Sequence, residues 1–299
     1  MFSKLIKIKD LQFWALSLAL LLLCAALFKP SIKTHAEIYN YIFVIDITQS
    51  MNTRDYAVAG LPADRLSFVK RAIQQALTQL PCHSKVGLGL FTAKNMFLLF
   101  EPLEICQHYA VIEHSLMKID WRMAWAANSH IARGLYTSIR ELSKLTSKPR
   151  LVFFTDGQQT PASVKEPPFI LKRGLVPGII MGAGNLQPAP VPKLDQNNNP
   201  AGYWKISEAE SQRGYTAIPT PAPDSNYLSS LKENELKKLA GTTGLQYWHL
   251  ESPKQFIKIL QSRTLGQTQM INTDISWILV LLALLIISLP YFRYLNDDR

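Results

Sequence analysis

Several motifs of well-known enzyme classes are missing from this chain of 299 residues. It has three cysteines and no Cys-x-x-Cys pair, so a thiolate zinc site is not indicated. It has neither a Walker phosphate-binding loop nor a Gly-x-Ser-x-Gly nucleophile elbow, which argues against a P-loop NTPase and an α/β-hydrolase. No internal repeat is found, which argues against a solenoid or a propeller.

Basic runs are also short, although the formal net charge is +10. No run of lysine and arginine exceeds two residues, and aromatic residues do not alternate with basic ones as they do on RNA-binding sheets. We therefore expect no nucleic-acid partner. We interpret the charge as solvated surface, with an acidic partner or an anionic lipid as the alternative.

Charge is absent from two apolar segments, residues 11–28 and 275–292. A helix over residues 11–28 would be roughly 27 Å long, against a membrane hydrocarbon core of about 30 Å. Both segments are apolar all round rather than on one face. They predict two transmembrane helices. The alternative for the first is a cleaved signal peptide, for which Thr34-His35-Ala36 is a poor cleavage site.

Lysines near the start of the chain set the expected topology. Lys4, Lys7 and Lys9, with the amino terminus, outweigh the basic residues that follow the first apolar segment. This predicts a cytoplasmic N-terminus at residues 1–10, a central domain across the membrane, and a cytoplasmic tail at residues 293–299. In a bacterium, the chain would be an inner-membrane protein with its domain in the periplasm.

One strand in the central region ends in a group of oxygen-bearing side chains. Tyr41–Ile45 is an unbroken apolar run, rich in β-branched and aromatic residues, that is typical of a buried central strand. Asp46 follows, and hydroxyls recur at Thr48 and Ser50. These hard oxygen ligands stand where open α/β sheets bind ligands. The alternative is a polar loop whose Asp or Ser caps the next helix.

A second strand ends in the same way. Residues 151–154 are an apolar run, and Thr155, Asp156 and Gly157 follow directly. Two strands that are remote in sequence and that both end in Asp indicate two contributors to one crevice at the carboxyl edge of the sheet.

These strand ends resemble the von Willebrand factor A (VWA) domain. That family carries a metal-ion-dependent adhesion site, written as D-x-S-x-S followed by a Thr and then an Asp. Asp46-x-Thr48-x-Ser50 matches the first motif with Thr for the first Ser, and Asp156 matches the last Asp. Ser129 takes the place of the Thr, in a loop where the usual Gly-Gly-Thr of the family is replaced by Ala-Asn-Ser.

The resemblance covers residues 39–260, and the order of apolar segments supports the fold that it implies. Strands are expected at 41–45, 86–91, 96–100, 151–154, 176–181 and 245–250, and helices at 64–80, 111–118, 131–145, 228–240 and 253–260. Their alternation predicts an α/β fold with a doubly wound, mostly parallel central sheet. Residues 96–100 form the antiparallel edge strand, because a tight turn joins them to residues 86–91.

A polar insertion at about 185–227 interrupts this pattern. Within it, Asp195–Asn199 resembles the start of an EF-hand loop, but Pro200 replaces the turn glycine and Ile206 replaces the bidentate glutamate. We interpret this segment as a surface hairpin turn.

The hairpin of the edge strand predicts a disulfide. If it folds about Lys94, residues equally distant from Lys94 face each other, and Cys82 and Cys106 are each twelve positions away. An oxidising periplasm would permit the bond. The alternative is two unrelated buried thiols. Cys24 lies in the first apolar segment.

The proposed ligand set suits a divalent cation. It comprises Asp46, Thr48, Ser50, Ser129 and Asp156. Mg²⁺ fits best, with Mn²⁺ and Ca²⁺ as alternatives, because all the ligands are oxygens. Hydroxyls would bind the ion directly, and the carboxylates would act through them or through water. Few charged direct ligands leave the ion able to accept an Asp or Glu carboxylate from a partner protein.

Within the VWA family, the chain is most similar to bacterial membrane-anchored proteins that accompany MoxR-type AAA ATPases. Gly182-Ala183-Gly184 before the insertion is a shared feature, and the Asp120–Trp125 segment is most like the MxaL type of the methanol-dehydrogenase maturation cluster. This resemblance implies a non-enzymatic role in calcium insertion into periplasmic methanol dehydrogenase. Partners would be that enzyme, other VWA membrane proteins or a MoxR-type ATPase. A Bat-like role in aerotolerance, with a MoxR-type ATPase, is the alternative.

Two other classes of function stay open. A metal-activated hydrolase would need a general base, and His130 is the one histidine beside a proposed ligand, although it is more typical of a solvated loop. A structural scaffold without metal is the other. Trp121 and Trp125 could form a recognition rim, but packing is the more usual role of such residues.

Overall fold

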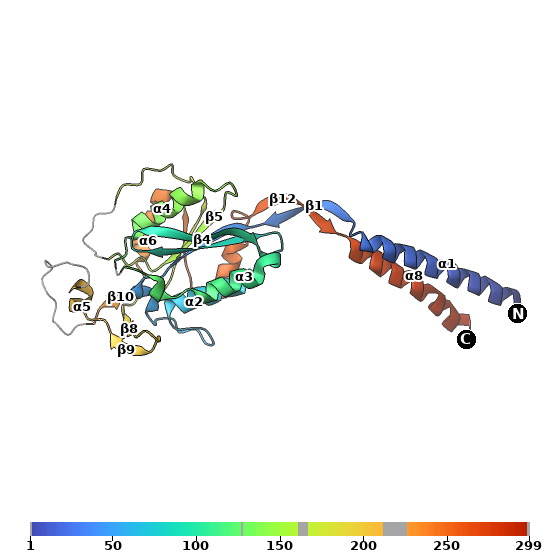
Figure 1. Cartoon of the computed structure of the whole chain (residues 1–299), viewed down its shortest axis with the longest axis horizontal. Helices are drawn as coiled ribbons and strands as arrows, with labels where there is room; N and C mark the ends of the chain where they lie inside the picture. Colours follow the sequence, from blue (N-terminus) through green and yellow to red (C-terminus); the bar gives the residue numbers. More distant parts are fainter. Residues whose placement is uncertain (1, 127, 161–166, 212–225, 298–299) are drawn as a thin grey trace. The chain divides into compact units, whose positions relative to one another are not determined.

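The computed structural model describes residues 2–126, 128–160, 167–211 and 226–297 of the chain. Two units follow from the contacts among them: Ile38–Gln267 forms one, and the chain before it pairs with the chain after it to form the other (Figure 1). The larger unit contains both predicted strand ends and is described first.

A six-stranded sheet forms the centre of the larger unit. Its order is β11 (Gln246–His249), β6 (Gly178–Gly182), β5 (Arg150–Thr155), β2 (Asn40–Asp46), β3 (Lys85–Thr92) and β4 (Asn95–Glu104). Every neighbouring pair is parallel except β3 and β4, which are antiparallel. The predicted mostly parallel sheet with one antiparallel edge strand is therefore confirmed.

Helices cover both faces of this sheet, as doubly wound folds require. The helices on one face are α2 (Arg65–Leu77), α3 (Ile105–Lys118) and α7 (Pro253–Leu260), and those on the other are α4 (Ile131–Ser143) and α6 (Glu233–Thr243). Phe43 and Ile45 point into the first layer, whereas Ile42 and Val44 point into the second. Because successive strand residues face opposite ways, the continuous apolar run serves two cores.

The order of strands brings the two predicted strand ends together. From β2 the chain winds outward through β3 and β4 on one side, and through β5, β6 and β11 on the other. The switch point therefore lies between β2 and β5, where Ile45 pairs with Phe154. Ligands bind at such points in open α/β sheets. Asp46 and Asp156 consequently lie at the same edge.

A glycine determines how closely α4 packs against the sheet. A Cβ atom on Gly134 would overlap the aromatic ring of Phe91 on β3. Only a residue without a side chain lets α4 approach the sheet this closely, and this contact fixes the helix that follows the Ser129 loop.

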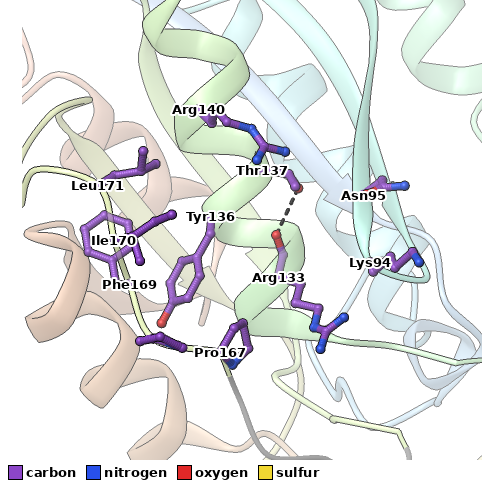
Figure 2. A pocket seen from close by; sticks show the side chains of 11 residues that line it. Lys94, Asn95, Arg133, Tyr136, Thr137, Arg140, Pro167, Phe169, Ile170 and Leu171 are labelled. Atoms are coloured by element: carbon purple, nitrogen blue, oxygen red, sulfur yellow. Dashed lines mark hydrogen bonds between the residues drawn. The ribbon is translucent and has the colours of Figure 1, made fainter.

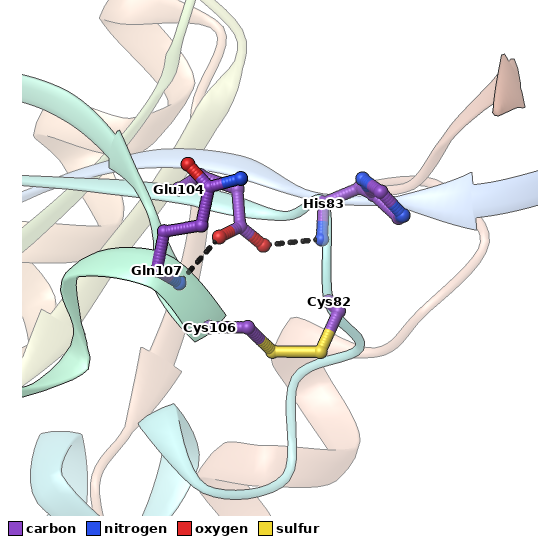
Figure 3. The surroundings of a disulfide bond; sticks show 5 residues. All are labelled: Cys82, His83, Glu104, Cys106 and Gln107. Atoms are coloured by element: carbon purple, nitrogen blue, oxygen red, sulfur yellow. Dashed lines mark hydrogen bonds between the residues drawn. A yellow bond between two sulfur atoms is a disulfide. The ribbon is translucent and has the colours of Figure 1, made fainter. Parts of the chain in front are cut away.

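The β3–β4 hairpin turns at Ala93-Lys94, and the structure joins Cys82 and Cys106 beyond its strands (Figure 3). The predicted uniform register is wrong: irregular pairing between Val86 and Gly89 shifts the partners on β4. Cys106 lies in α3 rather than on a strand, and its Cα is 5.4 Å from that of Cys82. Because both sulfur atoms are in the bond, neither is a thiolate ligand for metal.

Two predicted helices start at other residues. Helix α3 begins directly after β4, with Glu104 as its N-cap, and not at residue 111. Residues 228–229 form β10 (Leu228–Ser229), so α6 starts later than predicted. The helix also ends later than the predicted residue 240: Gly241 lies inside α6, and Gly244, with a φ of +85°, ends it.

The described part of the insertion consists of short elements: β7 (Ala189–Pro190), which pairs with β10, β8 (Pro192–Leu194), β9 (Pro200–Tyr203) and α5 (Ile206–Ser211). The predicted hairpin turn is confirmed, because β8 and β9 are antiparallel and Asp195 Oδ1 accepts bonds from the backbone of Asn197 and Asn199, both at 2.8 Å. Residues 212–225 of the predicted insertion lie outside the described residues.

The smaller unit consists of α1 (Phe2–Leu27), β1 (Ser31–Ile38) without its last residue, β12 (Gln267–Asp274) without its first, and α8 (Ser276–Asp297). Strands β1 and β12 pair, although neither was expected from the sequence. Helices cover all but one residue of each segment predicted to span the membrane, 11–28 and 275–292. Within the described part of the chain, however, none of the helices is both long and apolar enough to cross a bilayer. The last two residues of the predicted tail lie outside the description.

Candidate metal centre

Asp46, the last residue of β2, is fully buried and accepts three hydrogen bonds. Its Oδ1 accepts from the backbone N–H of Thr48 at 2.9 Å and from the Thr48 hydroxyl at 2.7 Å. Its Oδ2 accepts from the Thr155 hydroxyl on the neighbouring strand at 2.7 Å. The carboxylate therefore ties the loop after β2 to the end of β5.

The two hydroxyls of the first motif lie side by side. Thr48 precedes the short helix η1 (Gln49–Asn52), and its Oγ1 is 3.3 Å from Oγ of Ser50. Both residues are buried. The turn thus gathers the oxygen atoms of residues 46, 48 and 50 at one place, as the spacing of the motif predicts.

Asp156 follows β5 and is also fully buried. Its Oδ1 accepts a bond from the backbone of Gln158 at 2.8 Å. Its Oδ2 is 2.6 Å from Nη1 of Arg65 and 3.2 Å from the hydroxyl of Ser229. Only part of this carboxylate is available to a metal, which favours a role through water or through a hydroxyl.

Arg65 is a site residue that the sequence did not reveal. It begins α2, its side chain is completely buried, and it also pairs with Asp55 at 2.6 Å. A Cβ on Gly184, whose φ is +112°, would overlap its guanidinium group, so the glycine makes room for the arginine. A single arginine at the start of a helix carries no local signal of burial.

The carboxylate of Asp156 influences Asp46 and Arg65 electrostatically. Burial, followed by the negative charge of Asp156, raises the pKa of Asp46 to about 7, although hydrogen bonds from Thr155 and Thr48 oppose the shift. Burial lowers the pKa of Arg65, but Asp156 and Asp55 more than compensate, so its pKa is raised overall. The crevice therefore holds negative charge that one arginine does not fully balance.

Ser129 is buried and held by its backbone alone. Its N–H donates to Thr160 O at 2.9 Å, and its carbonyl accepts from Thr160 N at 2.8 Å. Its hydroxyl has no hydrogen-bond partner in the described structure. A buried hydroxyl without a partner costs about 1–3 kcal/mol. No hydrogen bond among the described residues joins it to the cluster of Asp46.

The donor set fits an oxygen-bound divalent cation on two observations. The first is the convergence of Asp46, Thr48, Ser50 and Asp156 at the switch point. The second is the unsatisfied hydroxyl of Ser129, which a metal would engage. The hydroxyl and carboxylate oxygens are those that Mg²⁺ and Ca²⁺ prefer.

The other aromatic and basic candidates near the site have structural partners. His130 donates its backbone N–H to Ala93 O at 2.6 Å, and burial, then Arg133 and Lys94, lower the pKa of its ring. Trp125 packs edge-on against Phe97 at 4.5 Å between ring centroids. Trp121 donates to the side chain of Asn198 at 2.8 Å.

Comparisons with known proteins support the fold. Residues 41–159 match the family model described as the von Willebrand factor type A domain. No curated protein matches the sequence. Among solved structures, the chain is similar to the conserved hypothetical protein BatB from Bacteroides thetaiotaomicron, with 17% identity and a TM-score of 0.51, over 74% of this chain and 94% of that one.

A second similar structure is an aerotolerance-related membrane protein from Bacteroides fragilis. It is 16% identical, with a TM-score of 0.48, over 73% of this chain and 94% of that one. The family-model match and the similarity to BatB show that the larger unit has an α/β VWA-like fold. The resemblance to the MxaL type is tested by none of these comparisons.

Proposed function

We propose that this VWA-like domain binds partner proteins through a divalent cation. The residues that would hold the ion are Asp46, Thr48, Ser50, Ser129 and Asp156. The observation that carries the proposal is the unpartnered Ser129 hydroxyl, buried in the loop that precedes α4, together with the oxygen cluster at the switch point between β2 and β5.

The residues of the proposed site have different roles. Thr48 and Ser50 present neutral oxygens, and Asp46 orients Thr48 by accepting from its hydroxyl. Arg65 holds Asp156 in place and shares its charge with Asp55. When bound, the ion would supply a positive centre with room for a carboxylate from the partner. We assign the role of general base to none of these residues and propose no reaction.

Thermal unfolding of the full chain with Mg²⁺, Mn²⁺ or Ca²⁺, against a chelator, tests metal binding. A ligand that binds only the folded state raises stability with its concentration. We expect stabilisation of the wild type and its loss in Asp46→Ala and Ser129→Ala. Asp195→Ala, in the exposed β8–β9 turn, and Ser147→Ala, which removes another unpartnered buried hydroxyl, are the matched controls.

The possible outcomes distinguish a metal-binding domain from a structural scaffold without metal. Equal stabilisation of the wild type and Ser129→Ala would remove Ser129 from the ligand set. If no cation stabilises the folded wild type, the proposal fails and a metal-free scaffold is the better reading. If the cation also failed to stabilise the two control variants, the ion would have to bind elsewhere on the surface.

We also propose the cellular process in which this partner binding takes part. The sequence resemblance supports maturation of periplasmic methanol dehydrogenase by calcium insertion, and a Bat-like aerotolerance role with a MoxR-type ATPase is the second candidate. The Cys82–Cys106 bond favours an oxidising compartment such as the periplasm. Affinity capture of the full chain from cell extract, with and without chelator, distinguishes the candidates by whether methanol dehydrogenase or a MoxR-type ATPase is retained.

A further inference from the structure

A groove lies over the outward face of α4, apart from the proposed metal ligands (Figure 2). Its cavity volume is about 360 Å³. The floor is the exposed ridge of α4, the segment 167–171 forms one wall, and the β3–β4 turn lies on the other side. The volume is within the range of about 300–1,000 Å³ that is usual for ligand sites.

The charged side chains that line this groove are all positive. Lys94, Arg133 and Arg140 line it, and no Asp or Glu is among the described residues that do so. Neither Lys94 nor Arg133 forms an ion pair with any described residue. Arg140 is 3.4 Å from Glu141, a carboxylate that Lys144 approaches more closely, at 2.6 Å. The groove therefore presents three cationic groups, of which Lys94 and Arg133 have no carboxylate partner among the described residues.

The remaining wall is apolar. Tyr136 and Phe169 pack with ring centroids 4.9 Å apart. Ile170 beside them is 87% exposed and extends this apolar wall. An apolar wall next to three cations is complementary to a ligand that has an apolar group and carboxylates together.

The spacing of the cations indicates the size of the ligand. Arg133 and Arg140 are separated by two turns of α4, or roughly 10 Å along the helix axis. A single phosphate group could contact both guanidinium groups only if the two side chains bent toward each other. An extended segment with several carboxylates can do so, while an apolar side chain between them contacts Phe169 and Ile170.

We propose that this groove binds an acidic peptide segment of a partner protein. Carboxylates of the segment pair with Lys94, Arg133 and Arg140, and an aromatic or aliphatic side chain packs against Tyr136, Phe169 and Ile170. Binding requires none of the proposed metal ligands and is therefore independent of cations.

The test measures fluorescence anisotropy of a labelled peptide, Asp-Glu-Phe-Leu-Glu-Asp, titrated with the full chain in the presence of chelator. Two further probes are a peptide with every acid replaced by Lys and one with Phe and Leu replaced by Gly. Arg133→Glu, Arg140→Glu and Ile170→Asp each alter an exposed lining residue. Arg71→Glu makes the same charge change on α2, across the sheet, and circular dichroism checks that each variant is folded.

We expect saturable binding of the acidic peptide, about tenfold weaker in each groove variant and unchanged in Arg71→Glu. The lysine peptide should not bind, and the glycine peptide should bind at least several-fold more weakly. Equal affinity of Arg133→Glu and Arg71→Glu would overturn the proposal, as would equal binding of the glycine peptide. Displacement of the peptide by inorganic phosphate, or groove-dependent binding to phosphatidylglycerol vesicles without peptide binding, would reject it in favour of a simple anion or lipid site.

Discussion

Arg65 brings a positive charge into the interior of the domain, where no part of its side chain is exposed. It lies between Asp55 and Asp156 and donates to Ser229 Oγ at 2.8 Å, so its charge is paired and its donors are largely used. Removing one member of a buried ion pair leaves the others uncompensated, which is more costly than the pair is worth.

We therefore expect Arg65→Met to lower the free energy of unfolding by about 3–5 kcal/mol in metal-free protein. Urea denaturation measures this loss. Arg71→Met, at an exposed position on the same helix, should change stability by less than about 0.5 kcal/mol. Similar losses in both variants would show that the buried pairs contribute little.

Asp46 makes stability depend on pH. Its pKa is raised from 3.8 to about 7 in the folded state, mainly by burial and then by Asp156. Between these values, the folded state keeps a proton that the unfolded state has released, so stability falls as the pH rises through this window and levels off above it. The carboxyl group thus favours the folded state at low pH, in the absence of metal.

Asp46→Asn removes this titration while keeping the shape of the side chain. We expect the decline in unfolding free energy between about pH 4 and pH 7 to be shallower in the variant, by about 1–3 kcal/mol over the window. Urea denaturation at several pH values in the presence of chelator gives the comparison, since the two proteins share their other titrating groups. Parallel pH curves would contradict the raised pKa.

At the scale of the element, α4 depends on close approach to β3. Gly134→Ala would push a methyl group into the ring of Phe91, so we expect destabilisation by about 1–3 kcal/mol. Gly241→Ala in α6 is the matched change, because a Cβ there meets no atom within 4 Å. It should stabilise the protein by about 0.5–1 kcal/mol through helix propensity. Thermal unfolding of both variants checks the opposite signs.

The sequence predicted accurately the elements that adjacent residues determine, and it missed elements that depend on distant parts of the chain. Helix α7 has the predicted bounds, because Ser252 caps it and Pro253 starts it. Strands β1 and β12 were missed, since each is mostly exposed and polar and is stabilised only by the other, from the opposite end of the chain.

The same distinction applies within the candidate site. The positions of Asp46, Thr48 and Ser50 follow from one turn, and their hydrogen bonds agree with the spacing of the motif. Arg65 and Ser229 approach Asp156 from distant parts of the chain, so neither contact could be read from its neighbours in sequence.

At the scale of the whole molecule, the Cys82–Cys106 bond links the start of β3 to α3 across a separation of 24 residues. Closing a loop of this size restricts the unfolded chain, and the expected gain is about 3 kcal/mol. We expect the double variant Cys82→Ala, Cys106→Ala to lose about 2–4 kcal/mol of unfolding free energy, measured by urea denaturation. Cys24→Ala should leave it unchanged.

Reductant should lower the melting temperature of the wild type and have no effect on the double variant. A wild type that is insensitive to reductant, while non-reducing mass mapping finds both thiols free, would contradict the bond.

The pairing of β1 with β12 has a mechanical consequence. Ile275 N donates to Pro30 O, and the hydroxyls of Thr34 and Thr273 are hydrogen bonded, so the two strands run in opposite directions. Tension applied between the two ends of the chain would separate this ladder one rung after another, like a zipper. The hydrogen bonds between β1 and β12 must all break before force reaches Asn40 on β2. These two strands would therefore bear the load before the central sheet is stretched.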